Sequence, residues 1–149
     1  MENKPPDNPA TVVLLIAAAA VLITLSALFS ISESSFLGMN KLRLRIKRKN
    51  GDRSALRAAK LLEKKDVLIN SLLVANDLVN ILLSAILTAA AIALFGKNGV
   101  GIATFTTTVL LLIFGEITPK AVSTRHPDVF AYALSKFVSV TVFIFKPIS

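Results

Sequence analysis

The first long apolar segment decides what this chain can fold into. Residues 10–32, ATVVLLIAAAAVLITLSALFSIS, contain no charged residue. At about 1.5 Å per residue, a helix of this length crosses the roughly 30 Å hydrocarbon core of a bilayer. A signal peptide is the main alternative, because Lys4 precedes the run, but the run is longer than the apolar region of a typical signal peptide. The sequence therefore predicts a membrane protein whose first helix spans the bilayer.

Two further apolar segments complete a predicted set of three transmembrane helices. Residues 67–95 form the second and residues 100–117 the third, and the short connection GKNG makes them antiparallel neighbours. Residues 129–147 are apolar again, but Lys136 interrupts them. We expect this last segment to be a juxtamembrane helix that lies along or dips into the cytoplasmic face. A fourth full span is the alternative.

The distribution of charge predicts the orientation. The chain carries a net charge of +8, and most of its basic residues lie in the loop at residues 38–66. By the positive-inside rule this loop is cytoplasmic, which puts the N-terminus outside a multi-pass protein of the plasma membrane. Asn50-Gly51 predicts a turn between two short amphipathic helices. Anionic lipid headgroups are the expected partner, and nucleic acid is not, because no aromatic residue interleaves with the basic ones.

Composition limits the remaining functions. Residues 1–9 are polar and proline-rich and predict a disordered arm, followed by one all-α membrane domain over residues 10–149. The chain stops at KPIS without a natural ending, so we expect the natural protein to be longer. It has no cysteine and a single histidine, which excludes thiolate and multi-histidine metal sites. No nucleophile–base pair occurs in the spans, so we expect no enzyme.

Three sets of polar residues interrupt the apolar runs, each toward the cytoplasmic end of its span. Residues four apart share one face of a helix, so each set should face the other helices and not lipid. The sets are Ser26, Ser30 and Ser34 with Glu33, then Asn76, Asn80 and Ser84 with Asp77, and finally Gly115 and Glu116 before Pro119.

These residues offer only oxygen ligands, which suit hard cations such as Mg²⁺, Ca²⁺ or Na⁺ better than copper or zinc. We expect Pro119 to break the third helix and to leave carbonyl groups near Gly115 and Glu116 free. A carboxylate in a membrane span costs about 2.5–3.5 kcal/mol on insertion scales, and a bound cation would offset that cost. The alternative for Glu116 is an ion pair with Lys120, four residues later.

Structural roles are also open for the other polar residues. Ser26 and Ser34 can bond to their own backbone or to a neighbouring helix, and the two asparagines can hold helices together. Asp77 can face water near the inner surface or oppose a lysine of the loop, and Glu33 can pair with the same loop.

Three stretches resemble the signatures of one family, in the family's order. ALFSISESSFLGMNKLRLR resembles the first-span signature of the CorC/CNNM (cyclin-M-like) magnesium transporters, which usually read FSGSE. VANDLVNILLSAI resembles the second signature, commonly GNNLVN, and GEITPKAVSTRHPD resembles the third, GEIxPK. Together the stretches extend over nearly the whole chain.

The resemblance implies a Na⁺-dependent Mg²⁺ exporter, built as a homodimer with three transmembrane helices and a juxtamembrane helix per subunit. It implies a Mg²⁺ site open to the cytoplasm, with Ser30, Asn80 and Glu116 as ligands and Asn76 and Gly115 as close neighbours.

The accessory residues and the missing regions complete these expectations. Asp77, Glu33 and Ser34 are possible accessory residues, and Asp77 stands where the family commonly has asparagine. Full-length members continue into cytosolic CBS domains that bind ATP; those are absent here, so we expect no nucleotide site. A membrane anchor or Mg²⁺ sensor for such regulatory domains is the alternative function, and a pore-forming, haemolysin-like protein is a more distant one.

Overall fold

The computed structural model describes residues 9–147, and every regular element in that range is helical. This confirms the predicted all-α fold. The elements are α1 (Pro9–Gly38), α2 (Lys41–Lys49), α3 (Arg53–Leu62), α4 (Lys65–Phe95), the 3₁₀ turn η1 (Gly96–Asn98), α5 (Gly99–Leu110), the π-helical η2 (Leu111–Ile117), α6 (Thr118–Arg125) and α7 (Pro127–Phe145).

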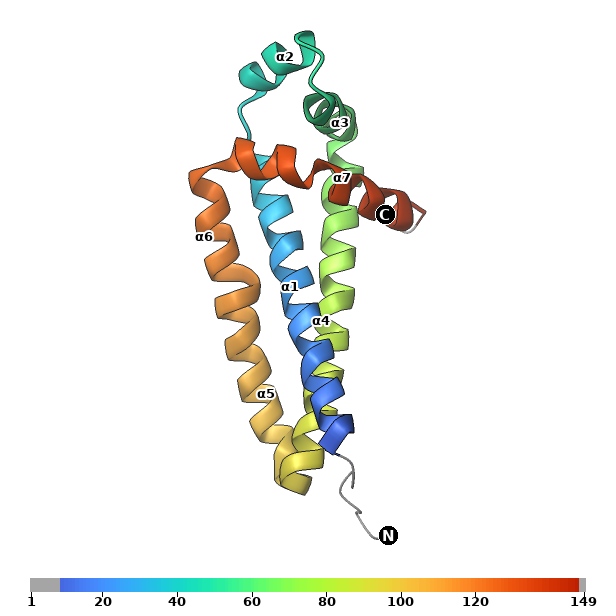
Figure 1. Ribbon diagram of the computed structural model, residues 1–149, viewed down its shortest axis with the longest axis vertical. Helices are drawn as coiled ribbons and strands as arrows, with labels where there is room; N and C mark the ends of the chain where they lie inside the picture. Colours follow the sequence, from blue (N-terminus) through green and yellow to red (C-terminus); the bar gives the residue numbers. More distant parts are fainter. Residues whose placement is uncertain (1–8, 148–149) are drawn as a thin grey trace.

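Three long helical rods dominate the molecule, with α1 between α4 and the continuous rod α5–η2–α6 (Figure 1). The hairpin at η1 joins α4 to α5, and Gly96 adopts a φ of +69° there, which favours glycine. At the opposite end of the rods, α7 runs across them, and the α2–α3 hairpin lies beyond it (Figure 1).

By length and composition, three helical stretches can cross a membrane: α1, the run Lys65–Arg125, and α7. The run Lys65–Arg125 folds back at η1 and so supplies two antiparallel rods. Although α7 is apolar enough to span, it crosses the ends of the rods, as expected for a helix along the membrane face. Large apolar side chains such as Ile81 and Phe105 are exposed on the rods, where lipid would cover them.

Most of the helices are longer than predicted. The first helix begins at Pro9 and continues to Gly38, beyond the expected end at residue 32. The proposed disordered arm at residues 1–9 therefore loses its last residue, and residues 1–8 lie outside the described range.

The prediction that Pro119 breaks the third helix is wrong. The helical path passes Pro119 and ends at Arg125. Pro119 occupies the first turn of α6, where proline is tolerated. The preceding segment η2 is π-helical, and this change of hydrogen-bond pattern accommodates the N–H that proline lacks.

The basic loop forms the two expected short helices, each with a side chain at its start. The Asn40 side chain accepts hydrogen bonds from the backbone N–H groups of Leu42 and Arg43 at 2.9 and 3.3 Å. Asp52 caps α3 in the same way. Between them Gly51 has a φ of +79°, so the predicted Asn-Gly turn is confirmed.

Polar and aromatic contacts hold α7 across the end of the bundle. The Asp128 carboxylate accepts a hydrogen bond from the Asn40 N–H at 2.8 Å and lies 3.5 Å from the Arg43 guanidinium. Between α1 and α7, the rings of Phe29 and Phe137 are 5.2 Å apart. The apolar core lies at this junction of α1, α3, α4 and α7, and it includes Phe36, Leu68, Leu72, Ala131 and Val138.

The close approach of α4 and α5 gives a stability prediction. A Cβ atom at Gly99 would lie 2.4 Å from the backbone oxygen of Ala91, which cannot move aside as a side chain could. We expect Gly99→Ala to destabilise the fold by about 1–3 kcal/mol, measured as a lower midpoint of thermal unfolding in detergent. At Gly101 nothing lies within 4 Å of the added Cβ, so Gly101→Ala is the matched control. Equal midpoints for the two variants would contradict the α4–α5 packing.

Candidate functional site

Ser26 is the meeting point of two helices. It is fully buried on α1, and its Oγ lies 3.1 Å from Asn76 Oδ1 and 2.9 Å from Asn80 Oδ1, both on α4. One hydroxyl carries one hydrogen and cannot donate to both amide oxygens at once. The three oxygens therefore present more lone pairs than hydrogens, an arrangement that suits a cation.

The same cluster can also hold the helices together without an ion. If either amide rotates by half a turn, its NH₂ group faces Ser26 and can donate to the hydroxyl. The cluster can thus exchange a hydrogen-bonded arrangement for one with its oxygens directed at a cation.

Ser30, one turn further along α1, binds the third rod. It is buried, and its Oγ donates a hydrogen bond of 2.6 Å to the carbonyl oxygen of Gly115. Pro119 lies four residues after Gly115 and lacks the N–H that an α-helix would direct at this carbonyl. The sequence predicted free carbonyl groups near Gly115 and Glu116, whereas in the structure the Gly115 carbonyl accepts this hydrogen bond from a serine of another helix.

The backbone of η2 is π-helical around Gly115, the residue that accepts the hydrogen bond from Ser30. The Thr118 N–H bonds to the carbonyl of Ile113, five residues back, which is the π-helical pattern. Such segments are rare and often mark functional sites. A Cβ at Gly115 would lie 3.0 Å from Ser26 Oγ, so the glycine lets η2 approach α1 at the level of Ser26.

Glu116 directly follows Gly115, whose carbonyl oxygen accepts the hydrogen bond from Ser30. It is half-buried on η2, and within residues 9–147 it makes no hydrogen bond or ion pair. Lys120 is instead directed at Glu33 on α1, with Nζ and Oε2 4.0 Å apart. The alternative in which Lys120 neutralises Glu116 is therefore not the arrangement in the structure.

The possible accessory residues lie less centrally. Asp77 is exposed on α4, Ser34 is half-buried on α1, and Glu33 pairs with Lys120 and not with the basic loop. In the described part of the chain, no hydrogen bond joins these three residues to the Ser26 cluster.

Ser26 is the residue that sequence reasoning undervalued. It belongs to the stripe with Ser30, but the family signature directs attention to Ser30, and the level at which α4 meets α1 cannot be read from spacing alone. Within residues 9–147 no three acidic or histidine side chains form a group that could hold a metal. A cation at this position would depend on neutral oxygens and on Glu116.

Residues 17–149 match the cyclin M transmembrane N-terminal domain, a family of membrane domains and not of enzymes.

Among curated relatives, the chain is 41% identical over 128 residues to a UPF0053 protein of Haemophilus influenzae, covering 86% of this chain and 30% of the relative. It is 41% identical over 124 residues to the UPF0053 inner membrane protein YfjD of Escherichia coli, covering 83% of this chain and 29% of the relative. A chloroplastic DUF21 domain-containing protein of Arabidopsis thaliana is 33% identical over 132 residues, with 87% of this chain and 20% of the relative covered. The chain thus spans less than a third of the length of these relatives.

Proposed function

We propose that this chain, which belongs to the cyclin M (CNNM) transmembrane N-terminal domain family, carries Mg²⁺ out of the cell in exchange for Na⁺. The observation that supports this most strongly is the convergence of the Ser26, Asn76 and Asn80 oxygens beside the Gly115 contact. Mg²⁺ is the transported substrate in this proposal, and Na⁺ is the coupling ion.

The donor set fits a hard divalent cation. Mg²⁺ binds oxygen ligands in a near-octahedral arrangement and gives up its water reluctantly. Neutral hydroxyl and amide oxygens can replace part of that water, and the carboxylate of Glu116 supplies the negative charge that they lack. We assign Ser30, Asn80 and Glu116 as the ligands, with Ser26, Asn76 and Gly115 as immediate neighbours.

Binding in such a cluster would change how the helices hold one another. Ser26 bonds α1 to α4, and Ser30 bonds α1 to η2. A cation competes with the serine hydrogens for the same oxygen lone pairs, so its arrival weakens both links. A ligand shifts a conformational equilibrium only through such differential contacts, and Na⁺ would favour the other arrangement of the same helices.

The proposed setting is the cell membrane, with the basic hairpin at the cytoplasmic face. The Escherichia coli relative is described as an inner membrane protein, and the apolar rods support the same environment for this chain. The homodimer and the attraction of the basic loop to anionic lipid are also proposals; the first rests on the family signatures and the second on charge.

Flux in liposomes tests the proposed function. The purified chain is reconstituted around a Mg²⁺-sensitive dye, and Mg²⁺ movement is followed with an opposing Na⁺ gradient or with K⁺ in place of Na⁺. We expect Mg²⁺ flux that needs the Na⁺ gradient and no leak of a co-trapped neutral dye. Leak of the neutral dye would favour a pore. Mg²⁺ binding without flux would favour the membrane anchor or sensor, and either result would contradict the exporter.

A further inference from the structure

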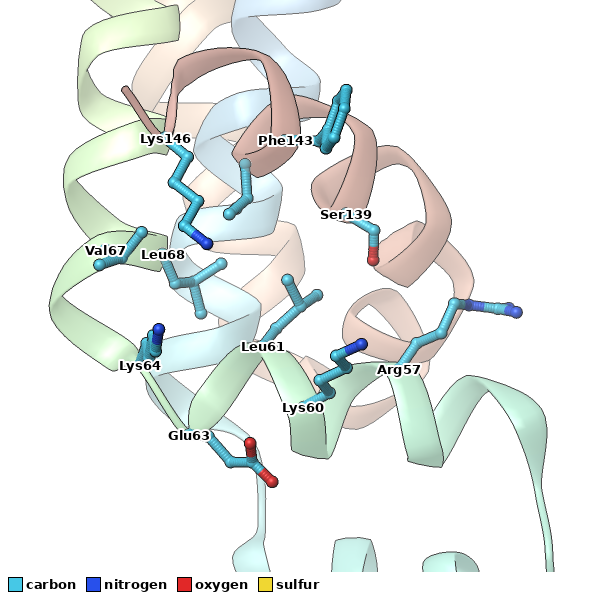
Figure 2. A pocket seen from close by; sticks show the side chains of 11 residues that line it. Arg57, Lys60, Leu61, Glu63, Lys64, Val67, Leu68, Ser139, Phe143 and Lys146 are labelled. Atoms are coloured by element: carbon cyan, nitrogen blue, oxygen red, sulfur yellow. The ribbon is translucent and has the colours of Figure 1, made fainter. Parts of the chain in front are cut away.

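A second feature of the molecule lies at the cytoplasmic end, away from the Ser26 cluster. A cavity of about 430 Å³ opens between α3, the beginning of α4 and the end of α7 (Figure 2). No member of the candidate cation site lines it. Its walls combine basic side chains on one side with apolar ones on the other.

Lys60 and Lys64 both line the cavity, and their like charges repel each other unless an anion lies between them. Figure 2 shows the amines of Lys60, Lys64 and Lys146 turned toward the space between the helices, whereas the Glu63 carboxylate points away from it. Arg57 also lines the cavity, and its Nε donates a 3.2 Å hydrogen bond to Ser135 Oγ, which fixes the guanidinium against α7. Charge complementarity therefore favours an anionic occupant.

The apolar wall is formed by residues that enter the membrane. Val67 begins the apolar part of α4, directly after the charged residues Lys64, Lys65 and Asp66. Phe143 on α7 lines the same cavity with its side chain 82% exposed. The cavity is therefore at the level where lipid headgroups meet acyl chains.

We propose that this cavity is a binding site for one anionic phospholipid of the cytoplasmic leaflet. Its phosphate lies against Lys60 and Lys64, and the start of an acyl chain follows Val67 and Phe143. A free phosphate would use the amines and leave the apolar wall unused, which is why the lipid is the occupant that fits both walls. The site is more specific than a general attraction of the loop to a charged surface, and it does not depend on the cation site.

Equilibrium lipid binding to the purified chain in detergent, read by native mass spectrometry, tests this site. The probes are phosphatidylglycerol, phosphatidylcholine and inorganic phosphate. We expect the double variant Lys60→Gln, Lys64→Gln to bind phosphatidylglycerol about tenfold or more weakly, because each basic residue near an anionic lipid strengthens the electrostatic attraction to it. The control pair Arg53→Gln with Lys65→Gln removes the same charge from the same region outside the cavity, and we expect little change.

Phe143→Ala separates lipid from free phosphate. It should weaken phosphatidylglycerol binding several-fold and leave the binding of inorganic phosphate unchanged, because only the lipid contacts the ring. Equal losses of phosphatidylglycerol binding for the Lys60/Lys64 pair and the Arg53/Lys65 control pair would reduce the effect to diffuse charge and overturn the proposal. So would equal binding of phosphatidylcholine, a phosphatidylglycerol affinity insensitive to Phe143, or no lipid binding at all, as expected if a second copy of the chain covers this face.

Discussion

Replacing Glu116 by glutamine should abolish Na⁺-dependent Mg²⁺ flux while the helical bundle stays folded. Glutamine keeps the size and the oxygen but loses the charge, and neutral oxygens alone compensate a divalent ion poorly. A close charge pair at an effective dielectric constant of 20 is worth about 4 kcal/mol, so we expect Mg²⁺ affinity to fall at least about 100-fold. Flux in liposomes measures the first effect, and thermal unfolding checks the fold.

Asp66→Asn is the control for that experiment. Asp66 is an exposed carboxylate in the first turn of α4, so its loss changes net charge equally without touching the Ser26 cluster. We expect its flux to stay close to that of the wild type. Full activity of Glu116→Gln would show that the carboxylate is not needed and would remove Glu116 from the proposed site.

Replacing Gly115 by valine should be nearly as damaging, for a steric reason. A Cβ alone at this position would lie 3.0 Å from Ser26 Oγ, and the two methyl groups of valine need more room still. The substitution should push η2 away from α1, break the hydrogen bond from Ser30 to Gly115, and remove Mg²⁺ flux. Overpacking of this kind costs about 1–3 kcal/mol of stability.

The series Gly115→Ala and Gly115→Val tests the geometry by degree. In Gly115→Ala, Ser26 needs to shift by only a few tenths of an ångström, so the Mg²⁺ flux of this variant should fall less than that of Gly115→Val. Gly101→Val places the same side chain on the same rod, at a position where nothing lies within 4 Å of the added Cβ. We expect this variant to keep Mg²⁺ flux close to that of the wild type. Wild-type flux in Gly115→Val would contradict the close packing of η2 on α1.

The apolar runs and the polar stripes in the sequence were enough to predict most of the fold and part of the candidate site. Long, predominantly apolar segments predicted the helices, because a membrane span must be mainly apolar over the thickness of the bilayer. Four-residue spacing placed Ser30 and Asn80 on interior faces, since residues four apart share a helix face. The contacts of Ser26 with α4 needed the relative height of two helices, which no local pattern contains.

Local rules failed where one helix compensates for another. Pro119 predicts a break in the helix because it has no backbone N–H to donate to the Gly115 carbonyl. In the structure the Ser30 hydroxyl donates to that carbonyl, and the helical segment continues past Pro119. The pairing rule for residues four apart suggested a Glu116–Lys120 pair, yet it assumes α-helical turns. The π-helical η2 has a different period, and Lys120 lies toward Glu33.

The last helix shows what composition cannot decide. By length and hydropathy α7 qualifies as a membrane span. Its direction across the rods is set by contacts with distant segments, among them Asp128 with Asn40 and Arg57 with Ser135. Lys136 suggested a juxtamembrane position from the sequence, and these tertiary contacts direct α7 across the ends of the rods.

Calorimetric titration with Mg²⁺ of the wild type, Ser30→Ala and Ser32→Ala tests the proposed cation site most directly. Ser32 is buried on the same helix, but its hydroxyl bonds to its own backbone, at the carbonyl of Leu28, 2.7 Å away. We predict saturable Mg²⁺ binding to the wild type and to Ser32→Ala, and binding weakened about tenfold or more in Ser30→Ala, because that variant loses one of the proposed oxygen ligands. Absence of saturable binding, or equal affinities for the two serine variants, would contradict a cation site among these oxygens.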